Sequence, residues 1–270
     1  MEGKKGRGRD GREREVRDVR GGKREGRKCR VPVTTFELLN HFVISAVVAE
    51  IVGVIGAIDG SHIPIKAPKK HHISYINRKG FHSILLQAVS DNNLLFTDCY
   101  AGEVGSVHDA CMFRRSDLYS QMTSGTTIFP PGSHLIGDPA YPLMTTLLTP
   151  YKDDGRLTAQ KNQFNRKLSA ARSSIERAFA LLKCRFRRLK YMDMTCTSLI
   201  PQCIIACCIL HNMCIRCGDI VELEEGSDDD DDAVQPPTDC AVHSNSTVSS
   251  HRQAAAKRDT ICHELSSRLH

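Results

Sequence analysis

The sequence has 270 residues, of which 40% are hydrophobic and 25% are charged, with 37 Lys and Arg against 31 Asp and Glu. This length suits one large domain or two small ones, and the apolar content excludes a chain that is disordered throughout. The net charge of +6 is unevenly spread, because residues 1–31 hold 13 basic and 6 acidic residues. The excess positive charge therefore belongs to the N-terminal segment.

Both ends of the chain differ in composition from its middle. Residues 1–31 consist largely of Gly, Arg, Lys and Glu and predict a disordered basic arm, which would contact nucleic acid, serve as a nuclear import signal or simply be solvated. Residues 32–51 hold the only helical pattern before the first strand and predict a residual N-terminal helix. Residues 218–270 begin with nine acidic residues between positions 219 and 232 and continue rich in Ser, Thr and His. They predict a disordered tail.

The middle of the chain, residues 52–217, reads as one α/β domain. Short apolar runs predict strands, and the turn Asp91-Asn92-Asn93 joins the second and third of them into a hairpin. Longer amphipathic or apolar stretches predict helices. Strands that are followed by a helix, a further strand and more helices predict a mixed sheet flanked by helices. The expected strands span 52–59, 83–91, 94–102 and 134–138, and the expected helices span 108–122, 163–191 and 201–217.

The chain has twelve cysteines, and its N-terminus is charged rather than signal-like. This combination predicts thiols rather than a disulfide framework, and an intracellular setting. Several cysteines follow helical spacing, with a single C-x-x-C pair, so a core helix is favoured over a zinc site. They are Cys203, Cys207, Cys208, Cys214 and Cys217. The longest apolar run, 43–58, is too short for a membrane span of about 20 residues.

Three acidic residues occupy positions where a catalytic acid would lie. Asp59 and Asp138 each end an apolar run that predicts a strand, and Glu176 lies in an amphipathic helix. Loops at strand ends are the usual ligand positions in α/β sheets. Carboxylates are the preferred protein ligands of Mg²⁺, and a pair of such ions supports in-line displacement at phosphorus. The pattern therefore predicts a divalent metal site.

The surroundings of Glu176 are strongly basic. Residues 161–190 contain ten basic residues and this one acid. Glu176 would either pair with Arg172 at i−4, or face the sheet beside the apolar stripe and require a cation. The basic side chains around it would neutralise nucleic-acid phosphates. Those expected to do so are Arg172, Arg177, Lys183, Arg185, Arg187 and Arg188.

Five blocks in order along residues 52–215 resemble the DDE domain of the Harbinger transposase-derived nuclease family. They are GAIDGSHIPI, NRKGFHSILLQAVSDNNLLFTDCYAGEVGSVHDACMF, LIGDPAYPLMTTLLTPY, FNRKLSAARSSIERAFALLKCRFRRL and IIACCILHNMCI. The resemblance implies an RNase H-like fold, two divalent ions, most simply Mg²⁺, and hydrolysis of DNA phosphodiester bonds. It implies that Asp59, Asp138 and Glu176 are the catalytic and metal-binding triad. It also implies a Myb-like DNA-binding protein as partner, and residence in nucleus and cytoplasm.

The sequence leaves the role of Asp109 and the effect of two departures from the family pattern open. Asp109, in the block GSVHDACMF, would be either a fourth metal ligand or the cap of its helix, and the cap is favoured because Asp is common there. The chain also departs from the family pattern, with Pro139-Ala140 after the second aspartate and only about 50 residues before the first block. These departures keep a second function open, that of a truncated or domesticated copy that binds DNA or protein without cutting.

Overall fold

The computed structural model describes residues 29–30, 51–124, 129–219 and 247–268. At its centre lies a six-stranded sheet with the order β1-β4-β3-β2-β5-β6. β2 pairs antiparallel with β3 and parallel with β5, so the sheet is mixed, as the order of strands and helices in the sequence predicts. The strands are β1 Cys29–Arg30, β2 Val54–Pro64, β3 Ser83–Ser90, β4 Phe96–Val104, β5 His134–Ile136 and β6 Leu147–Leu148. This α/β architecture is RNase H-like.

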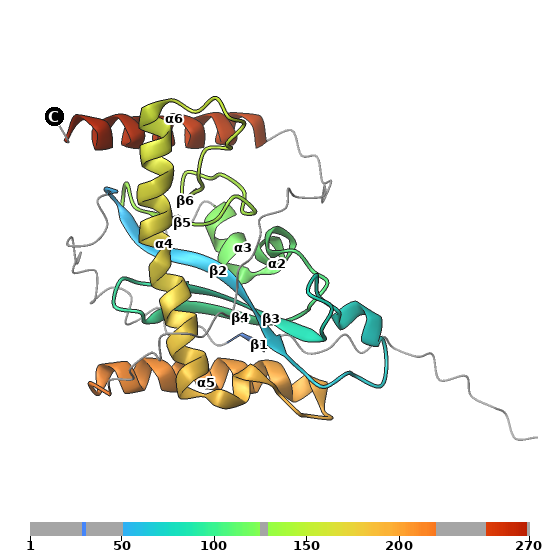
Figure 1. The fold of residues 1–270 in the computed structure, drawn as a ribbon. Coiled ribbons are helices and arrows are strands. Elements are labelled where there is room, and N and C mark those ends of the chain that lie inside the picture. Colours follow the sequence, from blue (N-terminus) through green and yellow to red (C-terminus); the bar gives the residue numbers. More distant parts are fainter. Residues whose placement is uncertain (1–28, 31–50, 125–128, 220–246, 269–270) are drawn as a thin grey trace, which may run out of the picture.

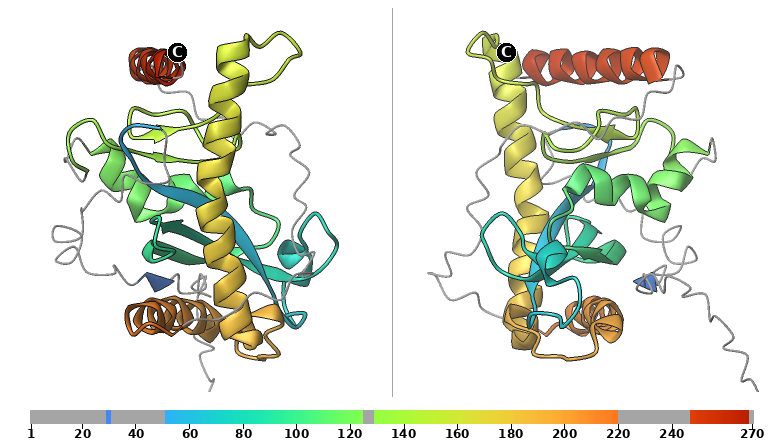
Figure 2. Two further views of the ribbon diagram at one scale, coloured as in Figure 1. Left: turned by 60° about the vertical axis from the view of Figure 1, so that its left-hand side comes forward. Right: turned by 90° about the vertical axis from the view of Figure 1, so that its right-hand side faces the viewer.

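Helices cover both faces of the sheet. The longest, α4 (Ala159–Arg185), crosses one face between α5 (Ile200–Arg216) and α6 (Thr247–Ser267), as Figure 1 shows. The short helices α2 (Asp109–Arg115) and α3 (Asp117–Thr123) lie on the opposite face (Figure 2). The predicted single helix over 108–122 is interrupted because Ser116 is extended and its hydroxyl accepts a hydrogen bond from the Tyr119 N–H.

Two apolar clusters follow from the alternation of side chains along the strands. In β2, Ala57 and Ile63 join the cluster beneath α4 and α5, whereas Ile58 joins Phe113 and Leu118 beneath α2 and α3. Successive residues of a strand point to opposite faces, which is why one strand serves both clusters. β2 is thus covered on both faces, and a polar side chain on it is enclosed by protein.

The predicted hairpin is confirmed. The Asp91 carboxylate accepts hydrogen bonds from the Asn93 and Leu95 N–H groups at 2.9 Å each, which closes the turn between β3 and β4. Leu94 takes a left-handed conformation there, with φ of 64°. Its carbonyl lies 3.1 Å from His211 Nε2 of α5, so the turn is held against that helix.

The cysteines of α5 belong to a core helix, as the sequence predicts. Cys208 is buried, and nine cysteines of the described residues carry free thiols. Cys111 is disulfide-bonded, which differs from the expectation that all cysteines are thiols. By length and composition the stretch Thr197–Arg216 is apolar enough to cross a membrane, with a mean hydropathy of 1.7. In the fold, however, Ile200, Ile204 and Ile205 pack into the cluster beneath the sheet.

The prediction of disorder throughout residues 218–270 is wrong for its last part. Residues 247–267 form α6, which buries four apolar side chains and packs against α4. Arg258 lies over the Tyr151 ring at 4.0 Å, and the Tyr151 hydroxyl donates to Asp259 at 2.7 Å. The buried residues are Ala254, Ile261, Cys262 and Leu265. The basic arm and residual helix predicted over 1–51 lie outside the described residues, except for β1 and Ile51.

Candidate active site

Asp59 lies in the middle of β2 and not at a strand end, because β2 continues to Pro64 while it pairs with β3. Its side chain is only 19% exposed. One carboxylate oxygen accepts the Gly60 N–H at 2.8 Å and the other accepts from Arg172 Nη2 at 3.1 Å. Burial raises the pKa of Asp59 to about 6, Arg172 opposes this rise, and the charge of Asp138 adds to it.

Asp138 follows β5 by two residues and lies in a tight turn. Its carboxylate accepts the Ala140 N–H at 3.0 Å, and its carbonyl accepts the Tyr141 N–H at 3.2 Å. Pro139 lies in this turn and is exposed. The charge of Asp138 raises the pKa of Asp59, so the two carboxylates lie within electrostatic reach of each other.

Asp109 lies against Gly60, on the face of β2 opposite to the one towards which the Asp59 side chain points. It is the first residue of α2, whose N-cap is His108, so the favoured interpretation of Asp109 as the helix cap is wrong. A Cβ atom at Gly60 would collide with the Asp109 carboxylate, because that carboxylate sits directly against the Gly60 backbone. Gly60 thus allows a second acid to approach the strand that carries Asp59.

Tyr141 connects the three aspartates. Its pKa is raised by burial and then by the charges of Asp109, Asp59 and Asp138. Its hydroxyl is buried and, within the described part of the chain, has no hydrogen-bond partner. Asp59, Asp109 and Asp138 are called the acidic cluster below. Buried polar atoms are rarely left unpaired, and the neighbouring acids distinguish this hydroxyl from the unpaired groups of Gln87 and Ser90 in β3, so the arrangement is a candidate functional site.

Glu176 is linked to the cluster only through Arg172. Arg172 Nη2 lies 3.8 Å from a Glu176 oxygen, in the i,i+4 pair that the sequence allows as one alternative. The Glu176 side chain is 59% exposed, whereas that of Arg172 is 16% exposed, so Glu176 does not point into the sheet. The Arg172 Nε is buried and lacks a partner among the described residues. A guanidinium therefore stands between the first and third members of the predicted triad.

The chemistry of the cluster suits a hard divalent cation. All of its ligand atoms are carboxylate oxygens, and burial with mutual repulsion raises the pKa of Asp59, which a bound cation would relieve. The spacing is not that of a preformed site, since within residues 51–124, 129–219 and 247–268 no group of three His, Cys, Asp or Glu side chains is placed to hold a metal ion. The kind of donor atom therefore suits a hard cation, whereas the arrangement of the three acids among the described residues does not form a complete site.

The six basic residues predicted to meet phosphate divide into three groups. Arg172 donates a hydrogen bond to the Asp59 carboxylate. The Arg185 side chain is 8% exposed, lies 3.2 Å from the Asp219 carboxylate and donates to the Asp219 carbonyl at 2.8 Å. These two side chains are committed inside the fold. Lys183 is half-buried. The exposed members are Arg177, Arg187 and Arg188.

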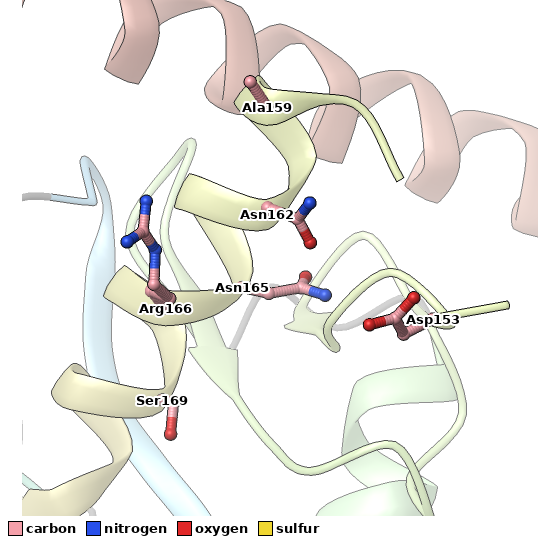
Figure 3. A pocket seen from close by; sticks show the side chains of 6 residues that line it. All are labelled: Asp153, Ala159, Asn162, Asn165, Arg166 and Ser169. Atoms are coloured by element: carbon pink, nitrogen blue, oxygen red, sulfur yellow. The ribbon is translucent and has the colours of Figure 1, made fainter. Parts of the chain in front are cut away.

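A polar hollow on the surface lies apart from these residues. It is lined by residues of the first turns of α4 and by Asp153, as Figure 3 shows. Asn165 within it donates to the Tyr151 carbonyl at 2.9 Å and accepts the Tyr151 N–H at 2.8 Å, so this amide holds the neighbouring chain in place. The lining residues are Asp153, Ala159, Asn162, Asn165, Arg166 and Ser169. None of them is a predicted catalytic residue.

Two residues of the site were not predicted in their present roles. Tyr141 belongs to the same block of sequence as Asp138, and its position three residues later was the available signal. Arg172 was assigned to phosphate, although its i−4 spacing from Glu176 already indicated an ion pair. Arg172 also contacts Asp59, which lies 113 positions earlier in the chain. No local sequence pattern predicts this tertiary contact.

Comparison with known proteins gives a consistent picture. Residues 58–212 match the family model described as DDE superfamily endonuclease. Relatives from Mus musculus and Homo sapiens, both named "Putative nuclease HARBI1", are 38% and 34% identical over 62% of this chain and 47% of their own length. An Arabidopsis thaliana relative, "Protein ALP1-like", is 31% identical over 65% of this chain and 45% of its own. The chain spans about half the length of these relatives, and no solved structure matches it.

Proposed function

Because this chain belongs to the DDE superfamily endonuclease family, we propose that it is a transposase-derived, metal-dependent nuclease that hydrolyses DNA phosphodiester bonds. The observation that carries the proposal is the partly buried pair Asp59 and Asp138, in which burial and the second charge raise the pKa of Asp59 to about 6. Titratable groups with strongly perturbed pKa values gather at functional sites. Both residues lie within the matched part of the chain.

The residues of the site have separable roles in this proposal. Asp59 and Asp138 would hold the divalent cation, in the simplest form two Mg²⁺ ions, and Glu176, now 59% exposed, would turn inward from α4 to complete the set. When bound, the cation would supply an activated water and stabilise the charge that develops on the phosphate oxygens. Asp109, on the far side of Gly60, adds negative charge close to the same strand.

Arg172 is a positioning residue in this scheme. At 3.1 Å from Asp59 and 3.8 Å from Glu176, its guanidinium keeps the Asp59 carboxylate ionised and brings Glu176 towards it. Because one Nη2 atom meets both acids, a cation that binds Asp59 must compete with this guanidinium. Metal binding and the Arg172 pair are thus coupled.

The exposed arginines give the proposal its DNA contact. Arg177, next to Glu176 on α4, and Arg187 and Arg188 just beyond the end of that helix are open to solvent. Guanidinium groups bind phosphate oxygens with two parallel hydrogen bonds, and each phosphate neutralised makes binding more sensitive to salt. A Myb-like DNA-binding partner and residence in nucleus and cytoplasm belong to the same proposal, by resemblance to the family.

A plasmid-nicking assay with Mg²⁺ tests the proposal. Asp138→Ala is expected to lower the nicking rate by about 10³-fold, because the ion it helps to hold contributes several kcal/mol to transition-state stabilisation. The control is Asp154→Asn, which removes an exposed acid whose oxygen accepts only the local Arg156 N–H. Wild-type nicking no faster than that of Asp138→Ala would sink the assignment.

A second function is favoured by one observation, namely that Arg172 already neutralises Asp59. On that basis the chain would be a truncated or domesticated copy that binds DNA or protein without cutting. Thermal melting with Mg²⁺ separates the two functions. A ligand that binds only the folded state must raise the melting temperature. No rise at millimolar Mg²⁺, together with intact DNA binding, would establish the non-cutting copy.

A further inference from the structure

The connection between β2 and β3 carries an unusual combination of charge and exposed apolar surface. Residues 66–82, called the β2–β3 loop here, contain five Lys or Arg and no Asp or Glu. At the tip of the loop lies the short 3-10 helix η1 (His72–Tyr75), which projects beside the ends of β3 and β4 (Figure 1). Within η1, Ile73 is 72% exposed, more than any other large apolar side chain of the described residues.

The exposure of Ile73 is built into the loop. Tyr75, two residues later, packs against the main apolar cluster, and the Ser74 carbonyl accepts the Ser106 N–H at 3.3 Å. His71 takes a left-handed conformation with φ of 55°, which is uncommon for a residue other than Gly, and its carbonyl accepts the Ser74 N–H at 3.1 Å. The loop thus holds Tyr75 inward and Ile73 outward.

The loop is also attached to the candidate active site. Arg78 Nη2 lies 2.7 Å from His108 Nδ1, and His108 immediately precedes Asp109 of the acidic cluster. At its other end, Lys66 pairs with Asp193 at 2.9 Å, and the carbonyl of Asp193 accepts from Arg188. The loop therefore lies beside the acids and is connected to the segment that presents the exposed arginines.

We propose that the β2–β3 loop docks on duplex DNA next to the scissile phosphate, with Ile73 inserted between base pairs and Lys69 and Lys70 on the flanking phosphates. The inference rests on the proposed function. Charge favours DNA over a protein partner, because the loop has no acidic residue and Lys69 and Lys70 are exposed beside Ile73. Apolar wedges flanked by basic side chains are a recurrent means of unstacking and kinking DNA.

Binding without cutting provides the test. The full chain is titrated in EDTA with short duplexes that carry 2-aminopurine at successive positions, so that fluorescence reports unstacking. Ile73→Ser is expected to weaken binding about tenfold, since burial of an Ile side chain favours binding by more than unstacking opposes it. It should also abolish the fluorescence rise at saturation. The control is Leu210→Ser, at an exposed apolar residue of α5 far from the loop in sequence.

The lysines give a second, independent measurement. Lys70→Gln is expected to reduce the salt dependence of binding by about one unit of slope and to leave the fluorescence rise at saturation unchanged. The exposed Lys152 serves as control in Lys152→Gln. Equal melting temperatures for wild type and Ile73→Ser would exclude misfolding as the cause.

The outcomes separate this inference from the proposed function. Wild-type affinity and wild-type fluorescence in Ile73→Ser would overturn the role of the loop, and would assign Ile73 to a protein contact if nicking persists. A wild-type chain that does not bind duplex DNA would overturn the inference as well. The nicking assay with Asp138→Ala reports on the proposed function by itself, because it does not depend on Ile73.

Discussion

Two regions of the molecule bury polar side chains with opposite results. Where α5 meets β4, Asn212 accepts the Phe96 N–H at 2.9 Å and donates to the Phe96 carbonyl at 2.7 Å, and His211 has partners on both ring nitrogens. In the acidic cluster, the pKa of Asp59 is raised to about 6 and the Tyr141 hydroxyl is unpaired among the described residues. Arg185, His211 and Asn212 are called the α5 anchor below.

The difference predicts a structural role for the α5 anchor and a functional role for the acidic cluster. In the α5 anchor every polar group offsets its desolvation with a hydrogen bond, so the anchor stabilises the fold. In the acidic cluster the charge of Asp138 raises the pKa of the partly buried Asp59, which costs stability unless a cation joins the two acids. Substitutions should therefore change stability in the anchor and activity in the cluster.

Asn212→Ala should give the largest change in stability. It leaves the N–H and carbonyl of Phe96 buried without partners, each at a cost of about 1–3 kcal/mol, so the free energy of unfolding should fall by about 4 kcal/mol. Urea unfolding measures it, with the exposed Asn162→Ala as control. Nicking per folded molecule should stay at the wild-type rate. A loss of nicking activity in Asn212→Ala without a loss of stability would contradict the structural role of the α5 anchor.

His134 tests a buried polar residue outside both regions, where α6 meets β5. Burial, and secondly Lys257, lower the pKa of His134 from 6.5 to about 4. The unfolded chain thus takes up this proton at higher pH than the folded chain. The contribution of neutral His134 to stability is complete above pH 6.5 and is lost as the pH falls towards 4, by up to about 3 kcal/mol.

His134→Leu is accordingly expected to lose less stability than wild type between pH 7 and pH 4.5. Urea unfolding at both pH values measures this, and the exposed His251→Gln should behave as wild type. An equal acid loss in wild type and His134→Leu would show that other groups set the acid sensitivity of the fold.

Arg172→Gln should lower stability less than Asn212→Ala, but it should change how the melting temperature responds to Mg²⁺. Removing the guanidinium leaves Asp59 without its counter-ion, at a cost of ~2 kcal/mol at pH 7, less than for a fully enclosed pair. Because Arg172 and a cation compete for Asp59, millimolar Mg²⁺ should raise the melting temperature of Arg172→Gln more than that of wild type. Arg177→Gln is the matched control. Equal Mg²⁺ shifts in all three proteins would contradict the competition.

Cys217→Ser should have the smallest effect. Cys217 is an exposed free thiol just beyond α5, so its replacement should change the free energy of unfolding by less than about 0.5 kcal/mol. EDTA should leave the melting temperature of wild type unchanged in the absence of added metal. A loss of several kcal/mol in Cys217→Ser, or a lower melting temperature of wild type in EDTA, would support the zinc site that the helical spacing argues against.

Patterns within short stretches accounted for most of the elements. The turn at Asp91, the long α4 and the apolar α5 follow from local periodicity and turn chemistry. The helix α6 was missed because its buried residues Ala254, Ile261 and Leu265 are sparse among polar ones. Such a stripe becomes a stable helix only against a surface, and α4 with the Tyr151 loop supplies that surface.

The sequence by itself determined the mixed α/β fold and the family, and it predicted the pair Asp59 and Asp138, because motif spacing and apolar periodicity are local properties of the chain. Only the tertiary structure decided that Asp59 lies within β2, that Asp109 faces Gly60, and that Arg172 stands between Asp59 and Glu176. Burial and charge at a site depend on residues far apart in the chain. The environment of each acid was therefore set by its neighbours in space.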